Sequence, residues 1–204
     1  MTKYKGKCQY RTIKGCKIMR KGYSMEKIKE LIDIGFDVNW KLIKIGYLGN
    51  SIIQPQLSKK DICDYGYWIL ENTDDNISLI SQLIGEVSDD YEFNNILFKL
   101  SKTELVDVDI QIRKWIVYML SNKLSSLSKD YFEGILEITE FWVSLGQPNN
   151  CPHIFQGVGN TITPEEYYTK EIYDMVILNH KNWLNKEIKD IILLENKYKK
   201  LVTT

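Results

Sequence analysis

Hydrophobic residues recur every three or four positions along almost the whole chain from Met25 onward, which is the spacing of an amphipathic α-helix. The stretch 107–127 shows the pattern most fully, because Ile112, Trp115, Ile116 and Met119 build one broad apolar face. Strand-like alternation is brief, and no Asn-Gly or Asp-Gly dipeptide separates two β-rich runs. We therefore predict an all-α protein in which residues 25–204 form a single compact domain of about seven or eight helices.

Residues that start or stop helices divide this pattern. Ser58 followed by Asp61 resembles a capping box and predicts a helix start. Gly35 predicts the end of the first helix, and the second is expected to end at Gly46 or Gly49. The helix after residue 127 is expected to be capped by Ser128. Its predicted core side carries Tyr131, Ile135, Ile138, Trp142 and Leu145.

One segment, Gly146–Thr169, interrupts the helical pattern before the C-terminal helix. It holds three of the four prolines and one of the two histidines. Thr163, Pro164 and Glu166 predict a short helix within it, and glycines supply positive φ. We predict a long ordered loop that clasps the preceding helix to the C-terminal helix and fixes their angle. The predicted clasp residues are Trp142, Pro148, His153, Gln156, Gly157, Asn160, His180 and Trp183.

The two histidines are the titratable groups that need an explanation. His180, Trp183 and Glu187 share one helix face, together with Val176. A set of Cys151, His153, His180 and Glu187 has residue types that suit zinc, yet neither His-x-x-x-His nor Cys-x-x-Cys is present. The favoured interpretation is that both imidazoles bond backbone carbonyls and pin the loop. We assign no catalytic residue, metal ligand or cofactor, and keep general acid–base catalysis near the loop as the alternative.

Charge is distributed unevenly behind a formal net charge of zero. Residues 1–24, a basic N-terminal extension, contain eight of the 27 basic residues and no acid, which leaves 19 basic against 27 acidic residues afterwards. An acidic body argues against general nucleic-acid affinity and favours a cationic partner.

An acidic stripe on the helix after residue 127 is the candidate surface for such a partner. Its members, at helical spacing, are Asp130, Glu133, Glu137 and Glu140. Tyr167 and Tyr168 are added as candidate aromatic anchors, although packing inside the protein would also explain them. A merely solvated face, or paired carboxylates for hydrolysis or Mg²⁺, are the alternatives for the stripe.

The sequence contains no secretory apolar stretch, and no run approaches eighteen uninterrupted apolar residues. The four cysteines form no disulfide framework. We therefore expect a cytoplasmic location, with no membrane partner.

Four stretches resemble a family of small bacterial proteins, domain-of-unknown-function family 2247. "NWKLIKIGY" is similar to its early Trp-x-x-Ile-x-x-Gly helix, and "RKWIVYML" to its Lys-Trp helix. "ITEFWVSLGQP" and "CPHIFQGVGNTITPEEYYT" resemble its Leu-Thr-Glu-Phe-Trp and Pro-His-x-x-Gln-Gly patterns. Gln147 stands where relatives have Tyr, which changes only local packing. The resemblance spans Met25 to Glu187.

Relatives of this kind look like immunity proteins of polymorphic and contact-dependent toxin systems. The resemblance implies a cytoplasmic, non-enzymatic protein that binds and neutralises the C-terminal domain of one cognate toxin, expected to be basic. The acidic stripe would then be the binding surface. The alternative is a metal- or histidine-dependent enzyme with a pocket near the 146–169 loop.

Overall fold

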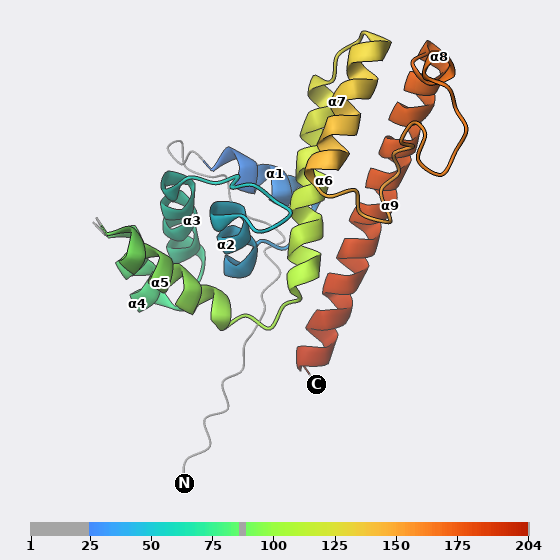
Figure 1. The fold of residues 1–204 in the computed structure, drawn as a ribbon. Coiled ribbons are helices and arrows are strands. Elements are labelled where there is room, and N and C mark those ends of the chain that lie inside the picture. The colour runs from blue at the N-terminus through green and yellow to red at the C-terminus, as the bar shows by residue number, and fades with distance from the viewer. Residues whose placement is uncertain (1–24, 86–88, 204) are drawn as a thin grey trace.

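The structure, a computed structural model, describes residues 25–85 and 89–203 and contains only helices and connecting segments in them (Figure 1). The predicted all-α fold is confirmed. The basic extension, residues 1–24, lies outside the described residues. The helices are α1 (Glu26–Ile34), α2 (Trp40–Leu48), α3 (Lys59–Asn72), α4 (Ile77–Ile84), α5 (Asp90–Lys102), α6 (Val108–Ser126), α7 (Tyr131–Ser144), α8 (Pro164–Tyr167) and α9 (Lys170–Thr203).

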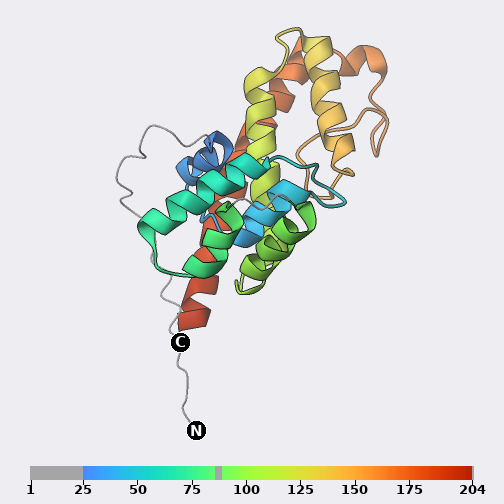
Figure 2. The ribbon, with the colours of Figure 1, turned by 90° about the vertical axis from the view of Figure 1, so that its left-hand side faces the viewer.

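Helix α6 lies at the centre of the molecule. The long helix α9 runs beside it, and α7 packs against α9 and α6 toward one end (Figure 1). Helices α1 to α5 gather on the other side, where α2 contacts α6, α3 and α5. Figure 2 shows the same division, with α7 and α8 at the end of the molecule remote from α4 and α5. In the described part of the chain, no helix combines the length and the apolarity required to cross a bilayer.

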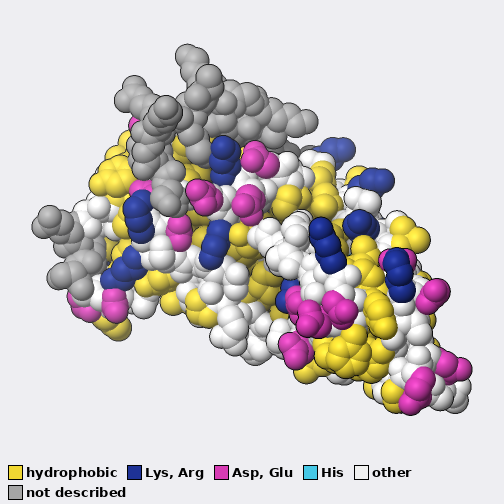
Figure 3. Space-filling view, turned by 90° about the horizontal axis from the view of Figure 1, so that it is seen from above, with side chains coloured by type: hydrophobic (Ala, Val, Ile, Leu, Met, Phe, Trp, Pro, Cys, Tyr) yellow, Lys and Arg dark blue, Asp and Glu magenta, His cyan; other side chains and the backbone are white. Residues whose placement is uncertain are grey.

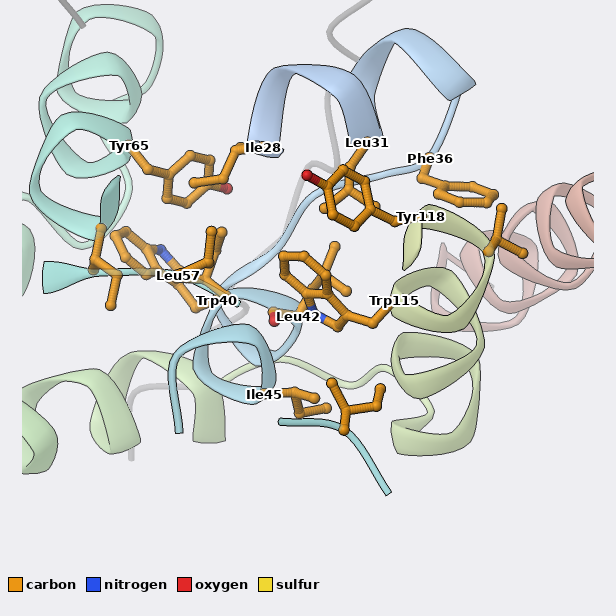
Figure 4. Packing of buried hydrophobic residues seen from close by; sticks show 14 of the residues in the cluster. Ile28, Leu31, Phe36, Trp40, Leu42, Ile45, Leu57, Tyr65, Trp115 and Tyr118 are labelled. Carbon is orange, nitrogen blue, oxygen red and sulfur yellow. Dashed lines mark hydrogen bonds between the residues drawn. The ribbon is translucent and has the colours of Figure 1, made fainter. Parts of the chain in front are cut away.

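The core forms where α6 meets the N-terminal helices. Trp115 is fully buried and points from α6 toward α2, where its Nε1–H donates to the carbonyl of Leu42 at 2.9 Å (Figure 4). Trp40 packs edge-on against Tyr65 of α3, with ring centroids 5.0 Å apart. Burying these large rings provides much of the apolar burial that stabilises the fold.

Local signals predicted several helix boundaries correctly. The Ser58–Asp61 capping box and Gly35 at φ 102° are both present. Gly49 terminates α2, whereas Gly46 lies inside the helix and against the Trp115 ring. Glycine is therefore needed at position 46 because the Trp115 ring leaves no room for a side chain, and not because the helix ends there.

The start of α7 differs from the prediction. Asp130, not Ser128, is the N-cap, and its carboxylate accepts from the backbone N–H of Phe132 and of Glu133 at 3.0 Å each. Tyr131 was expected in the core but is 42% exposed. The buried face of α7 begins only at Gly134 and Ile135, one turn later. Buried Ile135, Ile138, Trp142 and Leu145 agree with the prediction.

Candidate functional site

The 146–169 loop connects α7 to α9 and lies against both helices (Figure 1). The indole Nε1–H of Trp183 on α9 donates to the carbonyl of Asn150 in the loop at 2.8 Å. The same indole packs edge-on against Trp142 of α7, with ring centroids 5.6 Å apart. One side chain of α9 therefore contacts both α7 and the loop.

His180 links α7 to α9 and is completely buried. Its Nδ1 lies 2.6 Å from the carbonyl of Val176, one turn earlier in α9. Its Nε2 accepts the indole N–H of Trp142 at 2.7 Å. A carbonyl can only accept and an indole can only donate, so the neutral tautomer protonated at Nδ1 satisfies both bonds.

His153 fixes the loop to α7. Its Nε2 lies 2.8 Å from the hydroxyl of Thr139 on α7 and 3.2 Å from the hydroxyl of Tyr167 on α8. Both hydroxyls donate elsewhere, Thr139 to the carbonyl of Ile135 at 2.7 Å and Tyr167 to that of Ile154 at 2.5 Å. We therefore assign the proton to Nε2. The other nitrogen, Nδ1, is buried without a hydrogen-bond partner.

The two imidazoles meet, with ring centroids 5.6 Å apart. The bonding differs from the expectation that both would bind loop or helix carbonyls. Only His180 does so, and the carbonyl belongs to its own helix. His153 uses two hydroxyls, one of them from Thr139, a residue that the sequence did not single out. Thr139 lies one turn after the buried Ile135, and that position was its only sequence signal.

The remaining clasp residues shape the loop itself. Asn160 is its organising side chain: its amide donates to the carbonyls of Phe155 and Val158 at 2.8 and 3.0 Å. Gln156 donates to the carbonyl of Ile162 at 3.0 Å, and the Pro148 carbonyl accepts from the Cys151 amide at 2.9 Å. Gly157 has φ 73°, as expected where a side chain would be strained. The predicted cap of α8, from Thr163 to Glu166, is present. The contribution of the clasp to stability stays a prediction.

Protonation of this histidine pair is opposed by its surroundings. Burial, and to a smaller extent the neighbouring His180, lower the pKa of His153 to about 4. Burial also lowers the pKa of His180, against the opposing effect of the Val176 carbonyl. The hydrogen-bond partners of the two rings, among the described residues, are neutral hydroxyls, an indole and a carbonyl, so no carboxylate among them compensates a charge.

Stability is therefore expected to fall on acidification. The unfolded chain takes up a proton at His153 below its ordinary pKa of 6.5, whereas the folded protein does so only near 4. The stabilisation is complete above pH 6.5 and is lost as the pH falls toward 4, by up to about 3 kcal/mol. His153→Ala should lower the melting temperature at pH 7.5, because it removes the bonds to α7 and α8. Denaturant unfolding at several pH values measures both effects.

His153→Gln separates the two effects, because its amide can still donate to Thr139 but does not titrate. The difference in unfolding free energy between this variant and the parent should shrink as the pH falls from 7.5 to 4. Carboxylates that titrate in both proteins cancel in that difference. A pH-independent difference would contradict the lowered pKa of His153, and an unchanged melting temperature in His153→Ala would contradict the proposed clasp.

The zinc set considered from the sequence does not assemble. The carboxylate of Glu187 pairs with Arg113 at 2.6 Å, and the Cys151 thiol points to the carbonyl of His153 at 3.9 Å. Throughout residues 25–85 and 89–203, no three His, Cys, Asp or Glu side chains are grouped so as to hold a metal ion.

A groove of about 490 Å³ lies between α6, α7 and the 49–58 connection. Tyr118, Phe141 and Leu145 form part of its apolar floor, and Asn122 and Ser144 part of its polar rim. Among the described residues, no histidine, cysteine or carboxylate lines it. The enzyme alternative expected a pocket near the histidines, and this groove does not provide the groups that such a pocket would need.

The structure gives the members of the acidic stripe different surroundings. Asp130 caps α7, and Glu133 accepts from the hydroxyl of Ser128 at 2.9 Å. Glu137 pairs with Lys123 of α6 at 2.9 Å and is only partly exposed. Glu140 is exposed, and it forms no ion pair in the described part of the chain. The stripe is therefore partly a set of structural contacts, and Glu140 is its member without such a contact.

The two candidate tyrosines, Tyr167 and Tyr168, also differ in their exposure to solvent. Tyr167 is 1% exposed and bonded inside the protein, so it does not belong to a partner surface. Tyr168 is partly exposed, and its ring lies 4.8 Å from that of Phe132 in the first turn of α7. Phe132 is 46% exposed and was missed, because its neighbour Tyr131 was assigned to the core and Phe132 fell outside that face.

The accessible acidic and aromatic residues at the starts of α7, α8 and α9 define what we call the acidic end surface. Its members are Asp130, Tyr131, Phe132, Glu133, Glu165, Tyr168 and Glu171. The starts of α7, α8 and α9 lie together there (Figure 1). The contact between Phe132 and Tyr168 joins two of those helices. Figure 3, viewed from above, shows carboxylates beside hydrophobic surface at the end of the molecule that contains α7 and α8, with lysines interspersed.

Comparison with known proteins completes the description. No curated protein and no solved structure matches the chain. Residues 28–188 match the family DUF2247, described as uncharacterised proteins conserved in bacteria. That range runs from α1 into α9 and includes the whole clasp. Because the match covers most of the chain, the protein belongs to the DUF2247 family.

Proposed function

We propose that the protein is a cytoplasmic immunity protein, which binds the basic C-terminal domain of a cognate bacterial toxin and neutralises it without catalysis. The resemblance described above suggests this role. The observation that carries it is the aromatic pair of Phe132 and Tyr168, which is accessible at a surface rich in carboxylates. Aromatic anchors surrounded by a charged rim are typical of protein-binding surfaces.

Charge at this end supports a basic partner. Residues 129–174 at the three helix starts contribute Asp130, Glu133, Glu165, Glu166, Glu171 and Asp174. Lysines there are fewer, and Lys170 is already paired with Asp174 at 2.5 Å. Acidic residues also stabilise helix starts, so the charge has a structural cause as well. The helix dipole does not account for the exposed aromatic rings of Phe132 and Tyr168, which contact each other but remain accessible.

Growth rescue tests the role directly. The C-terminal domain encoded by the neighbouring gene is induced in a bacterial host, with and without the full chain. We expect the domain to stop growth, the chain to restore it, and the two proteins to co-purify. A toxic domain that the chain neither binds nor neutralises would count against the immunity role.

The surface is tested in the same assay and by calorimetry. Phe132→Ala with Tyr168→Ala should weaken the complex at least roughly 30-fold, because each aromatic anchor contributes about 1–2 kcal/mol. Glu140→Lys examines the stripe separately. Glu137→Lys is less informative, because it would place a second cation beside Lys123.

A matched control is Asp74→Lys with Asp75→Lys, in the exposed connection between α3 and α4. It changes the net charge at the remote end of the molecule and should leave the complex intact. Equal affinity for the parent, the aromatic variant and this control would mean that another surface binds the toxin.

A further inference from the structure

A second surface, remote from the acidic end surface, lies on α2 and α5. These helices are antiparallel neighbours, as two contacts establish. The rings of Tyr47 and Phe93 have centroids 5.6 Å apart, and the Nζ of Lys44 lies 4.9 Å from the centroid of the Phe98 ring. Helices α2 and α5 lie side by side in both ribbon views (Figures 1 and 2).

Large apolar side chains are exposed along this pair of helices. Phe98 is 55% exposed, Tyr91 is 74% exposed and Leu48, at the end of α2, is 49% exposed. Tyr91 and Phe98 are seven residues apart on α5 and therefore share a face. Leu105, in the α5–α6 connection, is 68% exposed.

The position of Leu105 is fixed by its neighbour Glu104. The carboxylate of Glu104 accepts from the backbone N–H groups of Trp40 and Lys41 at 2.8 and 2.7 Å, which caps the start of α2. The connection is thus held against α2. We call Lys44, Leu48, Tyr91, Phe98, Lys102 and Leu105 the α2–α5 surface.

The α2–α5 surface is basic at the end that carries Lys44, Lys99 and Lys102, whereas Asp90 and Glu92 flank Tyr91 at its other end. Lys44, Lys99 and Lys102 form none of the ion pairs found in the described ranges. Lysines in the last turn of α5 suit the helix dipole, which accounts for Lys99 and Lys102. It does not account for Lys44, in the middle of α2 and beside an aromatic ring.

The surroundings of Lys44 disfavour its positive charge, and no carboxylate among the described residues forms an ion pair with it. Its neighbour Lys41 directs its ammonium to the carbonyls of Glu104 and Val106, at 3.0 Å each. Burial, and then repulsion from Lys41, lower the pKa of Lys44. A carboxylate brought to this position would reverse that shift.

We propose that the α2–α5 surface binds an acidic, amphipathic helical segment of a partner protein, distinct from the toxin domain that the acidic end surface would take. The apolar side chains of the segment would cover Leu48, Phe98 and Tyr91, and its carboxylates would pair with Lys44 and Lys102. Helix-in-groove recognition uses such spacing of anchors along one face. Nucleic acid is disfavoured, because the body carries 27 acidic against 19 basic residues from Met25 onward and repels phosphates.

Fluorescence anisotropy with designed peptides tests this proposal on the full chain. The probe is a labelled helix of about 16 residues, with Leu at helical spacing and Glu on the remaining face. One comparison peptide has the same composition in shuffled order, and another has Lys in place of Glu. The ordered acidic peptide should bind at least about tenfold more tightly than either, and more weakly at high salt.

Two variants locate the site. Lys44→Gln with Lys102→Gln, and separately Phe98→Ala, should each weaken the acidic peptide about tenfold. The matched control, Lys181→Gln with Lys189→Gln on exposed positions of α9, should not. NMR should show the pKa of Lys44 rising when the peptide binds.

Three outcomes would overturn the proposal. They are no binding of the ordered acidic peptide, equal binding by the parent and both variants, and tighter binding of a labelled double-stranded RNA that is lost in the same variants. These results are independent of the immunity role, because Lys44→Gln with Lys102→Gln should still restore growth in the toxin assay.

Discussion

Gly46→Ala is expected to destabilise the protein by about 3 kcal/mol, although alanine is the better helix former. A Cβ at position 46 would lie 2.1 Å from Cζ2 and 2.6 Å from Cε2 of Trp115. The indole cannot move easily, because it is fully buried and donates to the Leu42 carbonyl (Figure 4). Either α2 and α6 separate or the hydrogen bond breaks, and both costs exceed the backbone benefit of alanine.

Gly66→Ala is the matched control inside another buried helix. Its added Cβ would meet Cγ2 of Ile84 at 2.6 Å, but Ile84 is the last residue of the short helix α4 and is only partly buried, so the helix end can shift. We expect a change below about 1 kcal/mol for this variant. Thermal unfolding separates the two, since 3 kcal/mol corresponds to roughly 6–12 °C in a protein of this size. Similar melting temperatures for both variants would contradict the packing role of Gly46.

Lys114→Met is expected to cost about 3–5 kcal/mol, because it removes one partner of a buried ion pair. Lys114 is completely buried and pairs with Glu195 of α9. Its ammonium also donates to the Asp37 carbonyl at 2.7 Å and to Oε1 of Gln111 at 2.9 Å. Among the described residues, the substitution would leave the carboxylate of Glu195 with a long bond from the Asp37 amide, at 3.4 Å.

The double variant Lys114→Met with Glu195→Leu should recover most of that loss. Burial lowers the pKa of Lys114 and raises that of Glu195, so desolvation outweighs the mutual attraction for each group. Removing both charges therefore relieves two desolvation costs. Denaturant unfolding of the parent, both single variants and the double variant measures the coupling. Additive losses would show that the two side chains do not act as a pair.

Much of the fold follows from local sequence. A few neighbouring residues are enough to encode each local feature: the helical period, the Ser58–Asp61 and Thr163–Glu166 capping boxes, and the helix end at Gly35. The hydrogen bonds of these caps join residues that are close in sequence, so they form without contributions from distant parts of the chain. The shared face of Val176, His180 and Glu187 on α9 also follows from spacing alone, and all three are buried. The sequence thus predicted which side of each long helix turns inward.

Sequence reasoning was weaker where a side chain has two possible environments. Tyr131 and Phe132 are adjacent, and periodicity assigned Tyr131 to the core, yet both are exposed, because the buried face of α7 begins only at Gly134 and Ile135. Tyr167 was a candidate for a partner surface but is buried against the loop. Glu137 was placed with the free acids but pairs with Lys123, fourteen residues earlier on α6.

By itself, the sequence determined an all-α fold, most helix boundaries and the ordered character of the 146–169 loop, because hydrogen bonds within a few residues encode these features. Only the tertiary structure decided that His153 and His180 meet, that Gly46 accommodates Trp115 and that Lys114 finds Glu195. The residues of each of these pairs are 27 to 81 positions apart. Their contacts depend on how whole helices pack, and helical periodicity specifies an inward face without specifying which side chain it will meet.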